Sequence, residues 1–405
     1  MTEGQSITRC RGFTVAGGTC GVKPSGKPDL MLLTAEVPCA AAAVFTRNRV
    51  VGAPVTVNQR HLRATGSVAR AIVCNSGFSN SATGARGIRD AEAMCRAVAA
   101  RVGCSPEQVL VCSTGVIGRP MPMTKILPGI ARTHGRLARG PRADAAAAAA
   151  ILTTDLAAKS AARRLSLEGR SVNLGGIAKG SGMIAPDLAT MLVFITTDCA
   201  ITPRALQAAL RQAARKSFNR VSVDQHTSPS DTVLVLASGL AGHRPIATSS
   251  GRGYVAFLAA LTDLCRDLAY QIVADGEGAT RVFRVRVIGA RSVDDADRVG
   301  RAIVDSPLVK TAVHGADPNW GRIVTAAGYS GAAIRAERMS LAINGVTVYR
   351  RGVPVAVRAP RRLAAIMRRK EITFTLDVGL GSASVEWLGC DLSRDYIRIN
   401  ADYTT

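Results

Sequence analysis

The feature that most constrains the fold of this chain is a glycine-rich segment between two apolar runs near the middle of its 405 residues. Residues 171–174 are predicted to form a strand, and the next eight residues, 175–182, include four glycines, which predicts a loop. Pro186 then precedes 191–195, an apolar run of strand length. Aromatic residues make up only 4% of the chain, while alanine and glycine are plentiful. Small side chains of this kind suit close-packed layers of helix and sheet.

Apolar runs of strand length alternate with segments of helical spacing along the rest of the chain. Strands are predicted at 29–33, 42–45, 71–74 and 108–112, and helices at 90–102, from 144 to 150, and at 203–215. From Arg281 onward a strand (282–288) is followed by a helix (293–303), and strands recur near 372–378 and 384–387. This βα alternation predicts a smaller αβ subdomain over about 281–405.

Composition restricts the class of protein. The chain is 47% hydrophobic and 20% charged, which is typical of a soluble globular protein. The apolar run at 191–195 is far shorter than the ~20 residues of a membrane-spanning helix. The first twenty residues contain no apolar run of the secretory type. We therefore expect a cytoplasmic protein with no membrane partner. The ten cysteines include no C-x-x-C pair and do not cluster with the five histidines, so no metal is expected.

The net charge of +23 has two interpretations. It could serve nucleic-acid binding, or it could belong to a basic surface on a protein with anionic small substrates. The arginines are spread along the chain, without a dense basic tail or a basic patch interleaved with aromatics. We expect no nucleic-acid partner. A non-catalytic nucleic-acid-binding protein stays as an alternative class, which a steep loss of DNA affinity with salt would favour.

Thr190 opens the apolar strand that follows the glycine-rich segment. A threonine hydroxyl is a weak nucleophile, but an N-terminal threonine has its own α-amino group, with a pKa of about 8, as base. Thr190 becomes N-terminal only if the chain breaks between Ala189 and Thr190. Its hydroxyl could attack the Ala189 carbonyl, take the acyl group from nitrogen to oxygen, and let water complete the cut. Taken alone, a threonine at the head of a strand is usually structural.

The segment 179–192, KGSGMIAPDLATML, resembles the cleavage-site signature of the ornithine acetyltransferase (glutamate N-acetyltransferase) family. Further blocks resemble the family in the same order, from one end of the chain to the other. They are 21–23, 29–30, 44–48, 112–118, 152–155, 275–280, 305–312, 317–322, and the terminal Tyr396, Asn400 and Thr405.

The resemblance implies a fold and an assembly. The fold is α/β, with a layered sheet-on-sheet core flanked by helices of the ornithine acetyltransferase/DmpA-like type. The chain is expected to be processed into an N-terminal α chain (1–189) and a C-terminal β chain (190–405), the latter including the smaller subdomain. Two such pairs are expected to assemble as a heterotetramer.

The resemblance also implies roles for individual residues. Thr190 is the expected nucleophile, and Ala189–Thr190 is the self-cleavage bond. Thr114 and Gly115 match the oxyanion hole, which suits a hydroxyl and a backbone N–H that follow a strand. The positions that match the family's substrate-binding residues are Thr153, Lys179, Thr190, Glu277, Asn400 and Thr405. Lys179 can pair with a carboxylate and Glu277 with an ammonium, as an amino-acid substrate requires.

The implied reaction is a ping-pong transfer. Thr190 takes the acetyl group of N2-acetylornithine, ornithine leaves, and the acetyl group passes to glutamate. Neither a metal nor a cofactor is needed, although some members of the family also accept acetyl-CoA as a substrate. A related self-cleaving amidase or peptidase, which gives the acyl group to water, is the alternative enzyme class.

Two loops depart from the family's pattern. Phe78, Ser81 and Ala82 stand where the family usually has Asn, Ala and Cys. Gln225-His226 and Pro229-Ser230 stand where it usually has small or acidic residues and Thr-Asn. These changes leave the nucleophile and oxyanion positions intact and bear on the choice of donor and acceptor. A paralogue that acetylates a related amino acid in secondary metabolism is therefore a further alternative.

Overall fold

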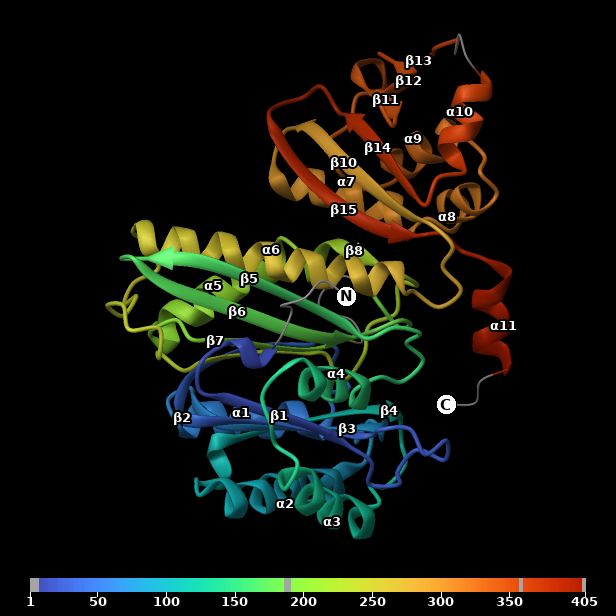
Figure 1. Cartoon of the computed structure of the whole chain (residues 1–405). Helices are drawn as coiled ribbons and strands as arrows, with labels where there is room; N and C mark the ends of the chain where they lie inside the picture. Colours follow the sequence, from blue (N-terminus) through green and yellow to red (C-terminus); the bar gives the residue numbers. More distant parts are fainter. Residues whose placement is uncertain (1–6, 186–190, 357–359, 403–405) are drawn as a thin grey trace.

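The computed structural model describes residues 7–185, 191–356 and 360–402. Figure 1 shows a larger unit of stacked sheets and helices, with a second sheet above it that carries its own helices. The expectation of a layered α/β fold with a sheet-on-sheet core is confirmed. In the part of the chain that is described, no helix is long and apolar enough to cross a membrane.

The larger sheet has the strand order β4-β3-β2-β9-β7-β6-β5, and β1 pairs with β2 off this path. Its strands are β1 Phe13–Gly18, β2 Leu30–Phe45, β3 Val68–Phe78, β4 Val109–Val116, β5 Lys159–Leu167, β6 Arg170–Lys179, β7 Leu192–Thr197 and β9 Thr232–Ala237. The long β2 joins two halves of this sheet. Its first part pairs with β1 and β3, and its last six residues pair with β9.

The two halves of the larger sheet face one another across a shared core. Along β7, Leu192 and Phe194 point into this core, while Val193 and Ile195 point to the opposite face, as the two-residue period of a strand requires. The helices α5 Pro203–Arg215 and α6 Arg252–Ala274 cover that opposite face (Figure 1).

The other half of the sheet has its own helical layer. The helices α1 Ala53–Ala64, α2 Gly84–Val102 and α3 Met123–His134 cover its outer face. The alanine-rich α4 Pro141–Ala150 adds Ala147, Ala148 and Ala150 to the shared core. The order of layers is therefore helix, sheet, sheet, helix, and each layer buries an apolar face.

Two sequence predictions were wrong about where strands end. Residues 175–179 are not a loop, because β6 continues through Lys179 and pairs with β7 up to Leu192. Gly176 serves helix packing instead: a Cβ there would lie 3.0 Å from Leu268 Cδ1 of α6. The runs 29–33 and 42–45 are likewise one strand, β2, whose pairing with β3 shifts register between Thr34 and Cys39. The proline at position 38, which has no N–H to donate, lies within that irregular stretch.

The second sheet has the order β13-β12-β11-β14-β10-β15-β8. Its strands are β8 Val221–Ser222, β10 Val282–Ala290, β11 Ser340–Ile343, β12 Val346–Arg350, β13 Val353–Pro354, β14 Glu371–Asp377 and β15 Ala383–Cys390. Its helices are α7 Val293–Asp305, α8 Pro307–His314, α9 Trp320–Gly328 and α10 Pro360–Met367. The βα alternation predicted after Arg281 is present, and β8 joins this sheet from an earlier part of the chain. The last helix, α11 Arg394–Asp402, runs back along the side of the larger unit (Figure 1).

Asp144 in α4 generates a stability prediction. Its carboxylate is buried and accepts a hydrogen bond from the Thr8 N–H, and burial raises the pKa of Asp144 to about 6. The native state therefore binds more protons than the unfolded chain between about pH 4 and pH 6, and this group costs stability as the pH rises through that window. Asp144→Asn removes the charge. At pH 7 it should raise the free energy of unfolding, measured by urea denaturation, by on the order of 1 kcal/mol.

The gain from Asp144→Asn should vanish at pH 4, where the native carboxyl is protonated. The matched control is Asp263→Asn, which removes the same charge from a side chain that is 56% exposed. Equal effects of Asp144→Asn at pH 4 and pH 7, or a loss of stability at pH 7, would contradict the prediction.

Candidate active site

A cavity of about 130 Å³ lies at the end of the sandwich where β6 ends and β7 begins. It brings together six of the residues predicted from the sequence, and they come from five separate parts of the chain. Its lining consists of Ser79, Thr114, Gly115, Ile117, Thr153, Thr154, Lys179, Gly182, Met183, Ser228, Pro229, Ser230, Glu277 and Asn400. Ala189, Thr190 and Thr405 lie outside the described residues.

Thr114 and Gly115 stand at the end of β4, beside the end of β3. Gly115 has a φ of +124°, and a Cβ there would lie 2.3 Å from the Gly77 carbonyl carbon, so the position requires glycine. Thr114 is buried, and its hydroxyl has no hydrogen-bond partner within the described ranges. That hydroxyl is therefore available to donate to an oxyanion in the cavity.

Lys179 supplies a buried positive charge. It is the last residue of β6, is 2% exposed, and stands opposite Leu192 of β7. Its nearest carboxylate oxygen in the described structure is Asp155 Oδ2, 3.9 Å from the Lys179 Nζ. This separation is too long for a hydrogen bond, so the ammonium keeps its donors for an anion in the cavity.

Glu277 supplies the opposite charge. The Asn400 side-chain amide donates to its Oε2 at 2.9 Å, and its own N–H donates to the Ser181 carbonyl at 2.9 Å. Gly182 leaves room for the carboxylate, because a Cβ there would lie 2.4 Å from the Glu277 Cδ. One small cavity thus has an ammonium and a carboxylate in its lining, which suits a ligand that itself carries both charges.

The backbone at the start of β7 is fixed by a residue that the sequence analysis missed. The Met191 N–H donates to Asp231 Oδ1 at 3.0 Å, and the Thr232 N–H donates to the Met191 carbonyl at 3.1 Å. Asp231 is fully buried, and burial raises its pKa well above the ordinary value. Its Oδ2 has no partner in the described part of the chain. A buried carboxyl side chain thus holds the residue that directly follows Thr190.

Asp155 was missed as well. It accepts hydrogen bonds from the N–H of Thr153 at 3.0 Å and of Gly180 at 2.6 Å, and it forms an ion pair with Lys159 at 2.7 Å. The available signal was its place at the end of the block 152–155, two residues after Thr153, with a lysine four residues later. Burial of both side chains, which shows the network to be internal, is not visible in that pattern.

The departures from the family's pattern divide into two groups. Pro229 and Ser230 line the cavity, and the Ser230 hydroxyl lies 3.0 Å from that of Ser81. Phe78 packs against the core beneath α2 and α3 instead. Gln225 donates to the Asp305 carbonyl, and the His226 N–H donates to Asp224, so neither belongs to the cavity lining. Among the described departures, Pro229 and Ser230, with Ser81 in contact with Ser230, are positioned to influence which ligand fits.

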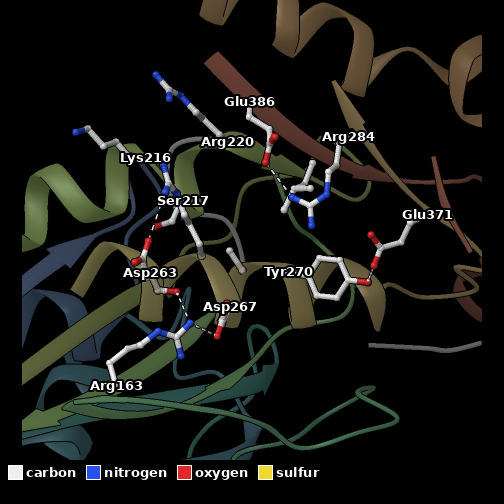
Figure 2. A pocket seen from close by; sticks show the side chains of 13 residues that line it. Arg163, Lys216, Ser217, Arg220, Asp263, Asp267, Tyr270, Arg284, Glu371 and Glu386 are labelled. Atoms are coloured by element: carbon white, nitrogen blue, oxygen red, sulfur yellow. Dashed lines mark hydrogen bonds and ion pairs between the residues drawn. The ribbon is translucent and has the colours of Figure 1, made fainter. Parts of the chain in front are cut away.

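A larger cleft, of about 500 Å³, separates α6 from the second sheet (Figure 2). Its charged groups largely pair with one another: Arg163 with Asp267, and Arg284 with Glu386 at 2.9 Å. Arg284 also lies 5.5 Å from the centre of the Tyr270 ring. Each of these ion pairs lies within one unit, whereas the Tyr270 hydroxyl of α6 donates across the cleft to Glu371 of β14. None of the predicted site residues that the structure describes lines this cleft.

Fold and cavity together define a layered α/β protein with a built site for a small ligand that carries both charges. Residues 14–405 match the ArgJ family. The arginine biosynthesis bifunctional protein ArgJ of Symbiobacterium thermophilum is 46% identical over 401 residues, with 98% of each chain covered. Its namesake in Deinococcus radiodurans is 44% identical over 406 residues, with 100% of both chains covered. The chain belongs to the ArgJ family, as the sequence blocks predicted.

A solved structure of the arginine biosynthesis bifunctional protein ArgJ of Bacillus halodurans shares 40% sequence identity, with a TM-score of 0.50. The match covers 98% of that chain but only 52% of this one. The solved chain is therefore about half as long as the chain described here.

Proposed function

We propose that this protein is a self-cleaving acetyltransferase that moves the acetyl group of N2-acetylornithine to glutamate through an acetyl-enzyme on Thr190. The observation that carries the proposal is the cavity beside the start of β7. There Thr114, Gly115, Thr153, Lys179, Glu277 and Asn400 come together in a member of the ArgJ family. The relatives' name, arginine biosynthesis bifunctional protein, supports a substrate from that pathway.

The first step is the cut itself. The Thr190 hydroxyl attacks the Ala189 carbonyl carbon, and the C–N bond breaks as the hydroxyl proton passes to the nitrogen. Water then hydrolyses the resulting ester, which leaves a carboxylate on Ala189 and a free amino group on Thr190. The half-length Bacillus halodurans chain supports this step, because a cut after Ala189 also leaves two chains that are each about half of the total.

The second step is acetyl transfer. The Thr190 amino group takes the proton of the Thr190 hydroxyl, whose oxygen attacks the acetyl carbonyl of the donor. The Thr114 hydroxyl and the Gly115 N–H stabilise the oxyanion that forms. Lys179 binds the α-carboxylate of the amino acid, and Glu277 binds its side-chain ammonium. Ornithine leaves with the proton, and the glutamate amine then takes the acetyl group, so that one amide replaces another.

Several finer expectations belong to this proposal. We propose two α chains (1–189) and two β chains (190–405) as the assembled form, in the cytoplasm, with neither a metal nor a cofactor in the reaction. The word "bifunctional" in the relatives' name supports acetyl-CoA as a second donor. Ser81 and Ser230, which contact one another, both depart from the family's pattern. Amino acids related to ornithine and glutamate should therefore be tested as substrates as well.

The competing enzyme class is a self-cleaving amidase that delivers the acyl group to water. The two classes differ in the acceptor: an acetyltransferase forms N-acetylglutamate faster than free acetate when glutamate is present. Formation of acetate alone, at a rate independent of glutamate, would favour the amidase.

Cleavage can be tested by intact mass of the purified protein. We expect two fragments, 1–189 and 190–405, with Thr190 as the new N-terminus. Thr190→Ala should remain one chain and lose transfer by several orders of magnitude, because both the attacking hydroxyl and the amino group that serves as base are then absent. Thr190→Ser keeps a hydroxyl and should still be cut. A single full-length mass from active enzyme would refute the cleavage step.

Gly182→Ala tests the role assigned to Glu277. The new Cβ would lie within 2.5 Å of all three carboxylate atoms of Glu277 and should displace it from Asn400. Ornithine affinity, measured by calorimetry, should fall about tenfold or more, which is the loss of one charge-assisted hydrogen bond. The matched control is Gly328→Ala at the end of α9, where a Cβ meets nothing within 4 Å. Unchanged ornithine affinity in Gly182→Ala would contradict the role of Glu277.

A further inference from the structure

Behind the cavity lies a buried cluster of two carboxylates and two ammonium groups. Lys159 is 1% exposed, and its Nζ donates to Asp155 Oδ1 at 2.7 Å, Asp275 Oδ2 at 2.6 Å and the Ala157 carbonyl at 3.1 Å. All three of its protons therefore have acceptors within the protein. Lys179 lies on the other side of Asp155, at 3.9 Å, and is held less closely.

Asp155 is saturated by partners other than Lys179. Its Oδ1 accepts from Lys159 and from the Gly180 N–H at 2.6 Å, and its Oδ2 accepts from the Thr153 N–H at 3.0 Å. Burial alone would raise the pKa of Asp155, but the charges of Lys179 and Lys159 and these hydrogen bonds lower it well below its ordinary value. Asp155 is thus a carboxylate that stays ionised out of contact with water.

We infer that Asp155 is a positioning residue for the substrate carboxylate: it supplies the counter-charge for the buried Lys179 side chain, without occupying the hydrogen-bond donors of Lys179. Lys159 makes this division possible, because it takes the direct ion pair with Asp155. The same carboxylate accepts hydrogen bonds from the N–H of Thr153, which lines the cavity, and from that of Gly180, which directly follows Lys179. This inference rests on the proposed function, in which Lys179 binds the carboxylate of an amino acid.

The other titratable groups around Lys179 do not provide this charge. Burial raises the pKa of Asp231 well above its ordinary value and that of the Cys74 thiol to about 12, so both favour their neutral forms. Lys23 is a cation, and burial lowers its pKa. Glu277 lines the cavity, but its carboxylate lies more than 4 Å from the Lys179 Nζ in the described structure. Asp155 is therefore the anion that balances Lys179.

Two variants separate this role from a general contribution to stability. Asp155→Asn keeps the shape of the side chain and removes its charge. Asp275→Asn removes the other carboxylate of the same cluster, which contacts Lys159 and the N–H groups of Leu156 and Ala157 but not Lys179. A purely structural cluster predicts similar effects of the two changes.

The measurement is the KM for glutamate as a function of pH, in cleaved enzyme with N-acetylornithine as donor. In Asp155→Asn we expect KM to rise about tenfold or more, and its alkaline increase to begin at lower pH than in the wild type, because Lys179 loses its nearest counter-charge. In Asp275→Asn, the KM for glutamate and the pH at which its alkaline increase begins should both match the wild type. Asp155→Ser, which also removes the charge, replaces the amide if Asp155→Asn fails to fold.

Equal KM values and pH profiles in the Asp155 and Asp275 variants would overturn the inference while wild-type transfer continues. A wild-type protein that neither binds ornithine in calorimetry nor transfers acetyl groups would instead overturn the proposed function. The two failures are therefore distinguishable.

Discussion

The antiparallel pairing between β6 and β7 is the interaction on which the site depends. It runs in register from Leu174 opposite Thr197 to Lys179 opposite Leu192. The proposed cut falls in the connection between these two strands, so their ladder would hold the two products in one sheet. The same ladder places Lys179, which ends β6, beside the residues that follow Thr190. Strand pairing thus provides the geometry of the cavity, and it would also hold the two chains together after the proposed cut.

The folding of the larger sheet upon itself supplies the remaining parts of the cavity. Because β2 runs through both halves, the ends of β3 and β4 in one layer come near the end of β6 in the other. Thr114 and Gly115 arrive from the first layer and Lys179 from the second. Glu277 follows α6, and Asn400 comes from α11, which returns from the second sheet (Figure 1). No short stretch of sequence contains this arrangement.

Periodic apolar patterns predicted much of the fold and ordered motifs predicted much of the site, for physical reasons that particular residues illustrate. The helix α5 has the bounds predicted for it, because its apolar spacing and the capping Thr202 are local signals. The extent of β6 was missed because four glycines in eight residues predict a turn from the sequence alone. In the structure, Gly176 instead leaves room for α6 to pack against the strand. Asp155 and Asp231 were missed because burial, rather than residue type, distinguishes a structural network from a surface charge.

The central claim is that Thr190 becomes an N-terminal nucleophile that carries the acetyl group. The most direct test is mass analysis of the 190–405 fragment after rapid quenching with N-acetylornithine in the absence of glutamate. The account predicts one added acetyl group, on the peptide that begins with Thr190, and its disappearance when glutamate is added. An unmodified fragment from enzyme that turns over, or an acetyl group on any other residue, would contradict it.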